Sequence, residues 1–198
     1  MSSYKSYPEK LFYPFKSNLD FTSGALEKGA KCWIRQLSEM IEVYDENNQS
    51  LILLESEDTI VYKVYEYEMP KEQGHLIPVT TILYPGRVGD QFFMTKGHYH
   101  EEKGTAEVYL IISGEGVLLM QTENGDYKEI YFSKGNLLYI PPFWAHRMVN
   151  VSNTEPLKFY GVYPANAGHD YDTIMNKGFR NKVVIDKNSP NNYKIIKS

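Results

Sequence analysis

Short segments that alternate hydrophobic and polar residues fill most of the chain after residue 59. Period-2 alternation broken by glycine, proline and asparagine is typical of β-strands joined by tight turns. The pattern predicts strands over residues 59–67, 78–84, 107–112, 116–122, 128–132, 136–140, 157–163 and 182–185. Asn124-Gly125 is the clearest hairpin turn between two of them. So many short strands without intervening helices indicate an all-β fold, an antiparallel sandwich or barrel.

The N-terminal part has a different pattern. Apolar residues at helical spacing predict one amphipathic helix over residues 33–44, through Trp33, Ile34, Leu37, Met40, Ile41 and Tyr44. Residues 45–50 are acidic and amide-rich and are interpreted as a solvated loop. Residues 1–30 mix aromatic residues with turn formers, which predicts an arm with at most one short strand. Its aromatic residues are Tyr4, Tyr7, Phe12, Tyr13 and Phe15.

Length and composition limit the possibilities further. The 198 residues allow one domain with a substantial core, in which residues 1–58 form an arm and helix packed on a barrel of residues 59–198 with its C-terminal extension. A net charge of −4 argues against nucleic acid or anionic lipid as a partner. The single cysteine, Cys32, and the lack of a long apolar run or signal-peptide core predict a cytoplasmic protein without membrane spans.

Three histidines and one glutamate carry the candidate chemistry. His98 and His100 are two residues apart, so in a strand both imidazoles point to one face. Glu107 opens the next predicted strand, and His146 follows a later one. Imidazole and carboxylate together suit a divalent ion such as iron, manganese, nickel or zinc and leave positions open for substrate. Taken alone, the His-x-His pair is also compatible with a solvated polar loop.

The surroundings of these residues favour the metal. Residues 107–114 read Glu-x6-Gly, and residues 135–150 read Gly-x5-Pro-x-Phe-x2-His-x3-Asn. This resembles the two motifs of the cupin superfamily, with Phe143 in place of a glycine and six residues instead of three or four between His100 and Glu107. The resemblance implies a cupin, a jelly-roll-like β-barrel with an N-terminal arm and one or two short helices, and a metal in its mouth.

A narrower resemblance extends from about residue 15 to residue 180. Its strings lie at residues 80–86, 93–100, 107–109, 139–147 and 163–171, and they look like those of the cupin-type glucose-6-phosphate isomerases of archaea and some bacteria. The resemblance implies the metal ligands His98, His100, Glu107 and His146. It implies a substrate-binding group of Tyr62, Thr81, Thr95, Lys96, Gly97 and Tyr163. It also implies a catalytic group of Glu107, Tyr109, His169 and Tyr171.

Several side chains keep two interpretations. Lys96 either contacts a phosphate or points outward. Arg147 should face away from His146 by strand alternation and is interpreted as a partner in a surface salt bridge. Composition alone assigns Tyr62, Tyr109 and Tyr163 to the core, whereas the resemblance assigns them to the sugar site.

The resemblance implies interconversion of glucose 6-phosphate and fructose 6-phosphate, in glycolysis and gluconeogenesis, by a homodimer. It implies one divalent metal per subunit, Fe²⁺ first, with Mn²⁺, Ni²⁺ or Zn²⁺ also suitable. Glu107 is the leading base for proton transfer between C1 and C2, and a hydride shift between these carbons is the alternative. Other hypotheses are an iron dioxygenase or a phosphomannose isomerase with the same ligands, or a non-catalytic sugar-binding cupin.

Overall fold

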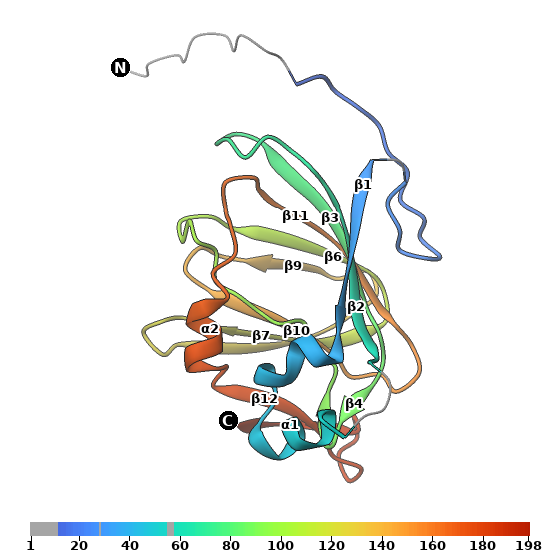
Figure 1. Ribbon diagram of the computed structural model, residues 1–198, viewed down its shortest axis with the longest axis vertical. Helices are drawn as coiled ribbons and strands as arrows, with labels where there is room; N and C mark the ends of the chain where they lie inside the picture. The colour runs from blue at the N-terminus through green and yellow to red at the C-terminus, as the bar shows by residue number, and fades with distance from the viewer. Residues whose placement is uncertain (1–11, 28, 55–57) are drawn as a thin grey trace.

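The computed structural model describes residues 12–27, 29–54 and 58–198, and its strands form three antiparallel sheets (Figure 1). The largest has the order β1 (Ala30–Gln36), β2 (Ile60–Tyr67), β3 (Leu76–Leu83), β11 (Leu157–Pro164), β6 (Glu107–Ser113) and β9 (Leu137–Ile140). The second has the order β10 (Ala145–Asn150), β7 (Glu115–Gln121) and β8 (Tyr127–Ser133). The third has the order β13 (Tyr193–Lys197), β12 (Asn181–Ile185), β5 (Gln91–Phe92) and β4 (Arg87–Val88). Apolar side chains of all three sheets form one buried cluster, so the predicted all-β class is confirmed.

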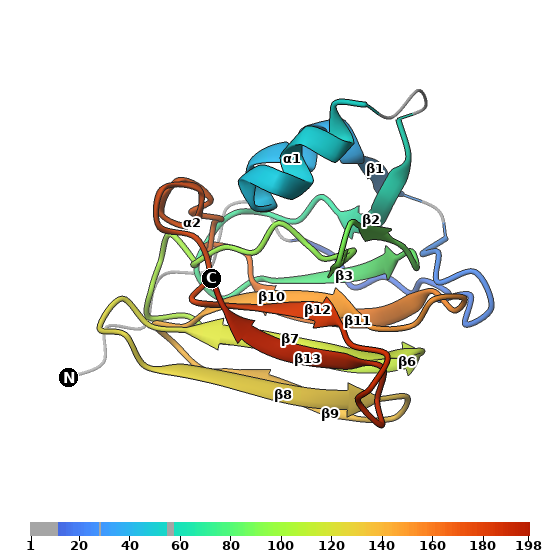
Figure 2. The same ribbon diagram turned by 90° about the horizontal axis from the view of Figure 1, so that it is seen from below.

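Within the described ranges, three short helices accompany the sheets. They are the 3₁₀-helix η1 (Leu37–Val43), α1 (Glu46–Ile52) and α2 (Asp172–Lys177). Figure 2 shows α1 on the opposite side of the molecule from β8 and β9. In the part of the chain that the structure describes, no helix has the length and apolar character needed to cross a membrane.

The register of the six-stranded sheet aligns side chains for the site. Val79 of β3 pairs with Glu66 of β2 on one side and with Gly161 of β11 on the other. Gly161 in turn pairs with Tyr109 of β6. Side chains alternate along a strand, so Thr81 projects from the same face as Val79. One face of this sheet therefore gathers polar groups from three strands, β2, β3 and β6, with Gly161 of β11 between them.

The strand predictions are confirmed for β2, β3, β6, β7, β8, β9, β11 and β12. The Asn124-Gly125 turn joins β7 to β8, with Gly125 at a φ of 95°. The pattern missed β1, β4, β5, β10 and β13. Every residue of β10 is buried, so this strand shows no alternation to detect. The segment 193–197, read from its composition as a polar tail, pairs along β12.

The predicted helix over residues 33–44 is wrong in its first part. Residues 30–36 form β1, which pairs with β2 so that Trp33 lies opposite Val64. Only Leu37–Val43 is helical, as a 3₁₀-helix that buries Leu37 and Met40. The free edge of β2 therefore decides the conformation, because long-range pairing outweighs a local spacing that fits a helix.

The loop prediction for residues 45–50 is also wrong, because α1 begins there. The Asp45 side chain caps the helix by accepting a hydrogen bond from the Asn48 amide at 3.1 Å. The Asn48 side chain is buried and donates to Gln91 Oε1 at 2.9 Å. Asp and Asn favour helix starts as well as loops, so composition alone did not separate the two.

The arm packs through its aromatic rings. Phe12 and Phe15 meet edge to face at 6.2 Å, and Phe15 lies 5.2 Å from the ring of Tyr67 in β2. In the described part of the arm, the expected short strand is reduced to an isolated bridge. The predicted arm residues outside the described part of the chain include Tyr4 and Tyr7.

Candidate metal centre and adjoining pocket

His98, His100, Glu107 and His146 meet in one cluster. Each residue offers a ligand atom, and these atoms all lie within 4.8 Å of one another. Glu107 is the first residue of β6 and His146 the second of β10. The extended segment after β5 carries the other two histidines, and a bridge holds it to β10 because the main chains of His98 and His146 exchange hydrogen bonds at 3.3 and 3.1 Å. The predicted juxtaposition of these four residues is therefore confirmed.

Thr105 orients the ring of His100. The Thr105 hydroxyl donates to the Glu102 carbonyl at 2.6 Å, so its oxygen accepts from His100 Nδ1, which lies 2.8 Å away. Nδ1 therefore carries a proton, and Nε2 faces Glu107 Oε2 at 3.3 Å. A hydrogen bond that holds one ring nitrogen and leaves the other for a cation is the usual support of a metal-binding histidine. Thr105 comes from the residues that lengthen the first cupin motif.

The remaining ligand atoms also fit a metal ion. Among the residues that the structure describes, His98 Nε2 and both ring nitrogens of His146 are buried without a hydrogen-bond partner. Buried polar atoms left without a partner are costly. Three neutral imidazoles and one carboxylate are a donor set for Fe²⁺, Mn²⁺, Ni²⁺ or Zn²⁺. The residues therefore fit the divalent ion that the sequence predicted.

Charge in the cluster follows the same logic. Burial raises the pKa of Glu107, but the neighbouring His100 and His146 rings outweigh it and lower the pKa to about 2. Burial, together with the adjacent histidine rings, lowers the pKa of His98 well below its ordinary value. The cluster thus presents an ionised carboxylate and a neutral His98, the protonation states that bind metal.

A pocket opens beside the cluster, and every predicted site residue except His100 lines it. Its lining consists of Trp33, Tyr62, Val64, Glu66, Val79, Thr81, Thr95, Lys96, Gly97, His98, Glu107, Tyr109, His146, Phe159, Tyr163, His169 and Tyr171. The two interpretations of the tyrosines are both met, because Tyr62, Tyr109 and Tyr163 are buried and also line the pocket.

One wall presents uncharged donors. The Thr95 hydroxyl oxygen accepts from the Met148 amide at 3.0 Å, which leaves its own proton free to point into the pocket. Thr81 and Gly97 line the pocket beside it, and Gly97 has a φ of 74°. Lys96 lines it too, with Nζ 5.9 Å from the centre of the Tyr171 ring, so this side chain does not simply point outward.

Another part of the pocket lining is aromatic. The Tyr109 ring lies 4.8 Å from that of Phe159 and covers Gly161, where a Cβ atom would come within 2.9 Å of the ring. Burial and the Glu107 carboxylate raise the pKa of Tyr109 well above its ordinary value. His169 stacks on Tyr171 with ring centres 5.8 Å apart, and burial lowers the pKa of His169 to about 4. Tyr109 is therefore a neutral donor and His169 a neutral acceptor near pH 7.

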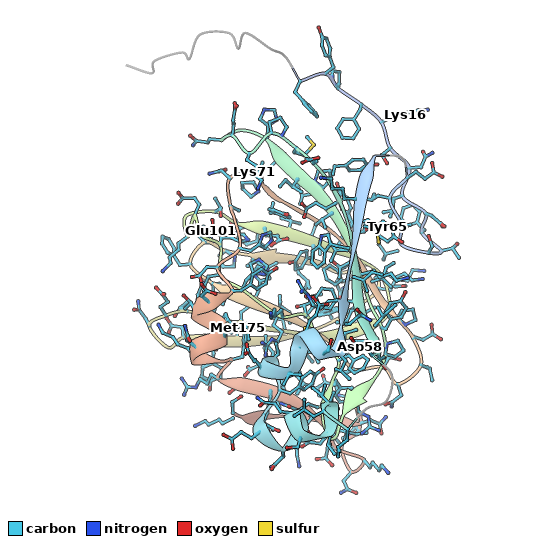
Figure 3. All side chains as sticks on the ribbon, in the orientation of Figure 1. Lys16, Asp58, Tyr65, Lys71, Glu101 and Met175 are labelled. Atoms are coloured by element: carbon cyan, nitrogen blue, oxygen red, sulfur yellow. The ribbon has the colours of Figure 1, made fainter. Side chains whose placement is uncertain are left out.

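Sequence reasoning missed two polar features of the pocket. Glu66 Oε2 accepts a hydrogen bond from the Tyr163 hydroxyl at 2.8 Å. Its signal was available, because Glu66 lies four residues after Tyr62 in one strand and therefore shares its face. Trp33 carried no comparable signal, since it reaches the pocket through the unpredicted pairing of β1. Figure 3 labels Lys71 and Glu101, which line an adjoining opening with Glu66 and His169.

The expectation of a surface salt bridge for Arg147 is wrong. Its side chain lines a different cavity from His146, as alternation predicts, but it is only 5% exposed. Its Nη2 donates to the Lys96 carbonyl at 2.6 Å, and the guanidinium lies 4.3 Å from the centre of the Phe179 ring. β10 is covered on both faces, so the side facing away from the metal cluster is interior rather than surface.

The backbone conformation at Phe143 explains how the fold accepts a phenylalanine where the cupin motif has a glycine. Its φ of 71° is one that glycine adopts easily, and its amide donates to the Lys103 carbonyl at 2.8 Å. The backbone therefore keeps the turn that a glycine would make, with the side chain exposed.

Known proteins resemble this chain over most of its length. The glucose-6-phosphate isomerase of Pyrococcus furiosus is 47% identical over 175 residues, 88% of this chain and 91% of that protein. The one of Thermococcus litoralis is 43% identical over 175 residues, 88% and 90% of the two chains. The one of Sinorhizobium medicae is 32% identical over 178 residues, 89% and 83%. Among solved structures, oxalate decarboxylase from Bacillus subtilis matches with a TM-score of 0.42 and 20% identity, over 55% of this chain and 26% of that one.

The antiparallel sheets and the cluster of three histidines and one glutamate at the pocket define a protein of the cupin class. The profile of the glucose-6-phosphate isomerase (GPI) family matches residues 34–197. The chain therefore belongs to the glucose-6-phosphate isomerase family, a family of enzymes.

Proposed function

We propose that this protein interconverts glucose 6-phosphate and fructose 6-phosphate with one divalent metal ion per subunit, as a step of glycolysis and gluconeogenesis. The observation that carries the proposal is the arrangement of one pocket. Three residues of the four-residue metal cluster line one side, and uncharged hydroxyl and amide donors line another. The names of the relatives supply the substrate.

The substrate phosphate is held by the donor wall in this proposal. Thr81, Thr95 and the Gly97 amide supply hydrogen bonds, with Tyr62 and Tyr163 beside them. Hydrogen bonds to a charged oxygen are stronger than neutral ones, so a few well-aimed donors serve a dianion. Lys96 adds a positive charge at the same wall.

His98, His100, Glu107 and His146 hold the ion. A divalent ion there supplies Lewis-acid polarisation of the sugar oxygens. We prefer Fe²⁺, and Mn²⁺, Ni²⁺ and Zn²⁺ accept the same imidazole and carboxylate ligands.

The chain's own groups move the protons. Glu107 is ionised and is the leading base for the carbon-bound proton, although a pKa lowered to about 2 makes it a weak one. Tyr109 keeps its proton and can donate to a sugar oxygen. His169, neutral because its pKa is lowered to about 4, can accept a hydroxyl proton during ring opening, with Tyr171 stacked against it.

A hydride shift from C2 to C1 is the second candidate for the chemical step, because the weak basicity of Glu107 favours a path without a base at carbon. Turnover in deuterated water separates the two. Proton transfer places solvent deuterium on the product carbon, whereas a hydride shift leaves the original hydrogen there.

The proposed function is tested by coupling fructose 6-phosphate conversion to a dehydrogenase specific for glucose 6-phosphate. Activity should disappear with a chelator and return when Fe²⁺, Mn²⁺, Ni²⁺ or Zn²⁺ is restored. Activity that survives complete metal removal would contradict the metal requirement. Oxygen consumption without isomerisation would indicate an oxygenase instead, and mannose 6-phosphate as the preferred product would indicate a phosphomannose isomerase.

Assembly and location complete the proposal. We propose a homodimer because the outer face of β6 and β9 exposes apolar side chains, with Leu110 and Leu137 paired in register and 41% and 66% exposed. Light scattering should give twice the chain mass, and Leu137→Glu should shift it towards the monomer.

Pairing of β1 with β2 supports one structural domain for residues 1–58 and 59–198. The lone Cys32, a free thiol, agrees with a cytoplasmic location.

A further inference from the structure

Arg147 is a buried, positively charged side chain, and a contribution to folding stability does not explain why it is there. Its guanidinium forms no ion pair with a carboxylate of the described residues, and Nε has no hydrogen-bond partner. An unpaired buried cation costs folding free energy. A role in the adjoining pocket accounts for the presence of this residue better than a role in stability.

The contact that Arg147 makes is with the back of the donor wall. Nη2 donates to the Lys96 carbonyl at 2.6 Å, and stacking on Phe179 at 4.3 Å fixes the plane of the guanidinium. In a planar trans peptide the carbonyl and the following N–H point in opposite directions. A Lys96 carbonyl held towards Arg147 therefore turns the Gly97 N–H away from Arg147.

Gly97 is shaped for this orientation. Its φ is 74°, and a Cβ atom would come within 2.7 Å of the Phe179 ring and 3.1 Å of Arg147 Cβ. Among the described residues its N–H donates to no protein acceptor. Gly97 lines the pocket beside Thr95, whereas Arg147 lines the cavity behind it.

We propose that Arg147 is a positioning residue that aims the Gly97 amide at the phosphate of the substrate. The charged donor on the carbonyl also polarises the peptide, which makes the N–H a stronger donor. The inference rests on the proposed function because it gives the bound phosphate a partner in the main chain. It also explains how a chain of net charge −4 binds a dianion without a basic patch.

The test compares two ligands that differ by the phosphate, 6-phosphogluconate and gluconate, by calorimetry on the zinc-loaded protein. Arg147→Met should weaken 6-phosphogluconate by about tenfold and leave gluconate within about twofold. Arg147→Lys keeps the charge but not the planar fork, so its affinity for 6-phosphogluconate should lie between wild type and Arg147→Met. KM for fructose 6-phosphate should follow the same order, with kcat unchanged.

Arg180→Met is the matched control. Arg180 also lies over an aromatic ring, at 4.4 Å from the centre of Tyr127, and donates to a backbone carbonyl, that of Gly125, at 3.0 Å. It is exposed and does not line the pocket, so this variant should bind both ligands as wild type does. Metal content is measured for every variant because Arg147 follows a metal ligand.

A direct readout needs no substitution at all. The Gly97 amide proton, observed by NMR in glycine-labelled zinc-loaded protein, should shift with 6-phosphogluconate and stay in place with gluconate. Equal weakening of both ligands, wild-type affinity in Arg147→Lys, loss of metal in Arg147→Met, or a Gly97 signal that ignores the phosphate would overturn the inference.

The outcomes also separate this inference from the proposed function. If the protein is an isomerase but the Arg147 variants show no phosphate-selective effect, only the inference about Arg147 is contradicted. If the Arg147 variants do show that effect but the protein isomerises neither sugar phosphate, only the proposed function is contradicted.

Discussion

The two sides of the pocket are built on different principles. The metal side uses three histidines and one glutamate, residue types that commonly bind metal ions. Thr105 orients one of the histidines. The donor side uses hydroxyls, one peptide amide and an arginine behind the wall, none of which stands out in a sequence. A site made of metal-binding side chains can be found from residue types and their spacing. A site made of backbone amides, whose direction depends on the fold, cannot be found in this way.

The strongest way to break this comparison is to change the metal side. Glu107→Gln should lower kcat by about 10² to 10⁴, because it removes the carboxylate that serves as ligand and leading base. The measurement is steady-state turnover with metal content determined in parallel. The control is Glu66→Gln, which changes another carboxylate of the same pocket. The glutamine can keep the hydrogen bond from Tyr163, so kcat should stay within about threefold of wild type. Full turnover in metal-loaded Glu107→Gln would remove Glu107 from the role of base.

The next effect sharpens the comparison by leaving all four ligands in place. Thr105→Val removes the nearer of the two Thr105 acceptors of His100 Nδ1 and leaves the carbonyl at 3.3 Å, so metal affinity should fall about 10- to 100-fold. Competition with a chromophoric chelator measures it. Thr154→Val, a threonine in an exposed loop, is the control and should bind metal normally. Unchanged affinity in Thr105→Val would mean that the ring is oriented by its other neighbours.

A smaller effect is expected on the donor side. Thr95→Val removes one hydrogen bond to the phosphate, which should raise KM for fructose 6-phosphate about tenfold with little change in kcat. Steady-state kinetics checks this split. Thr95→Ser keeps the hydroxyl and its bond from the Met148 amide and should restore KM. A loss in kcat instead would place Thr95 with the metal side.

The smallest effect lies outside both sides. Asp45→Ala removes the cap of α1 and the ion pair with Lys182 at 2.7 Å, so the free energy of unfolding should fall by about 1 kcal/mol with kinetics unchanged. Burial raises the pKa of Asp45, but Lys182 and the Asn48 amide outweigh it and lower the pKa below its ordinary 3.8. Its stabilising contribution is therefore present above pH 3.8 and is lost as the pH falls through the folded-state pKa. Denaturant unfolding at several pH values should show wild type and variant converging in acid.

Predictability from the sequence follows the same division. Alternation and turn residues located most of the strands, and the His-x-His spacing together with the cupin-like motifs around Glu107 and His146 located the metal cluster. The 33–44 segment misled because its apolar spacing fits a helix until β2 offers an edge to pair with. Arg147 misled because alternation gives the side of a strand but not what covers it, and Phe179 covers this one. Both errors concern contacts between residues distant in the chain, which local patterns do not contain.

The missing side chain at Gly161 makes room for a ring of the pocket. The Tyr109 ring occupies the space that a Cβ atom would take, so a position of β11 with no side chain of its own decides where this ring lies. For protein engineering, Gly161 is therefore a place to reshape the pocket without changing a metal ligand, because a methyl group there would displace the Tyr109 ring.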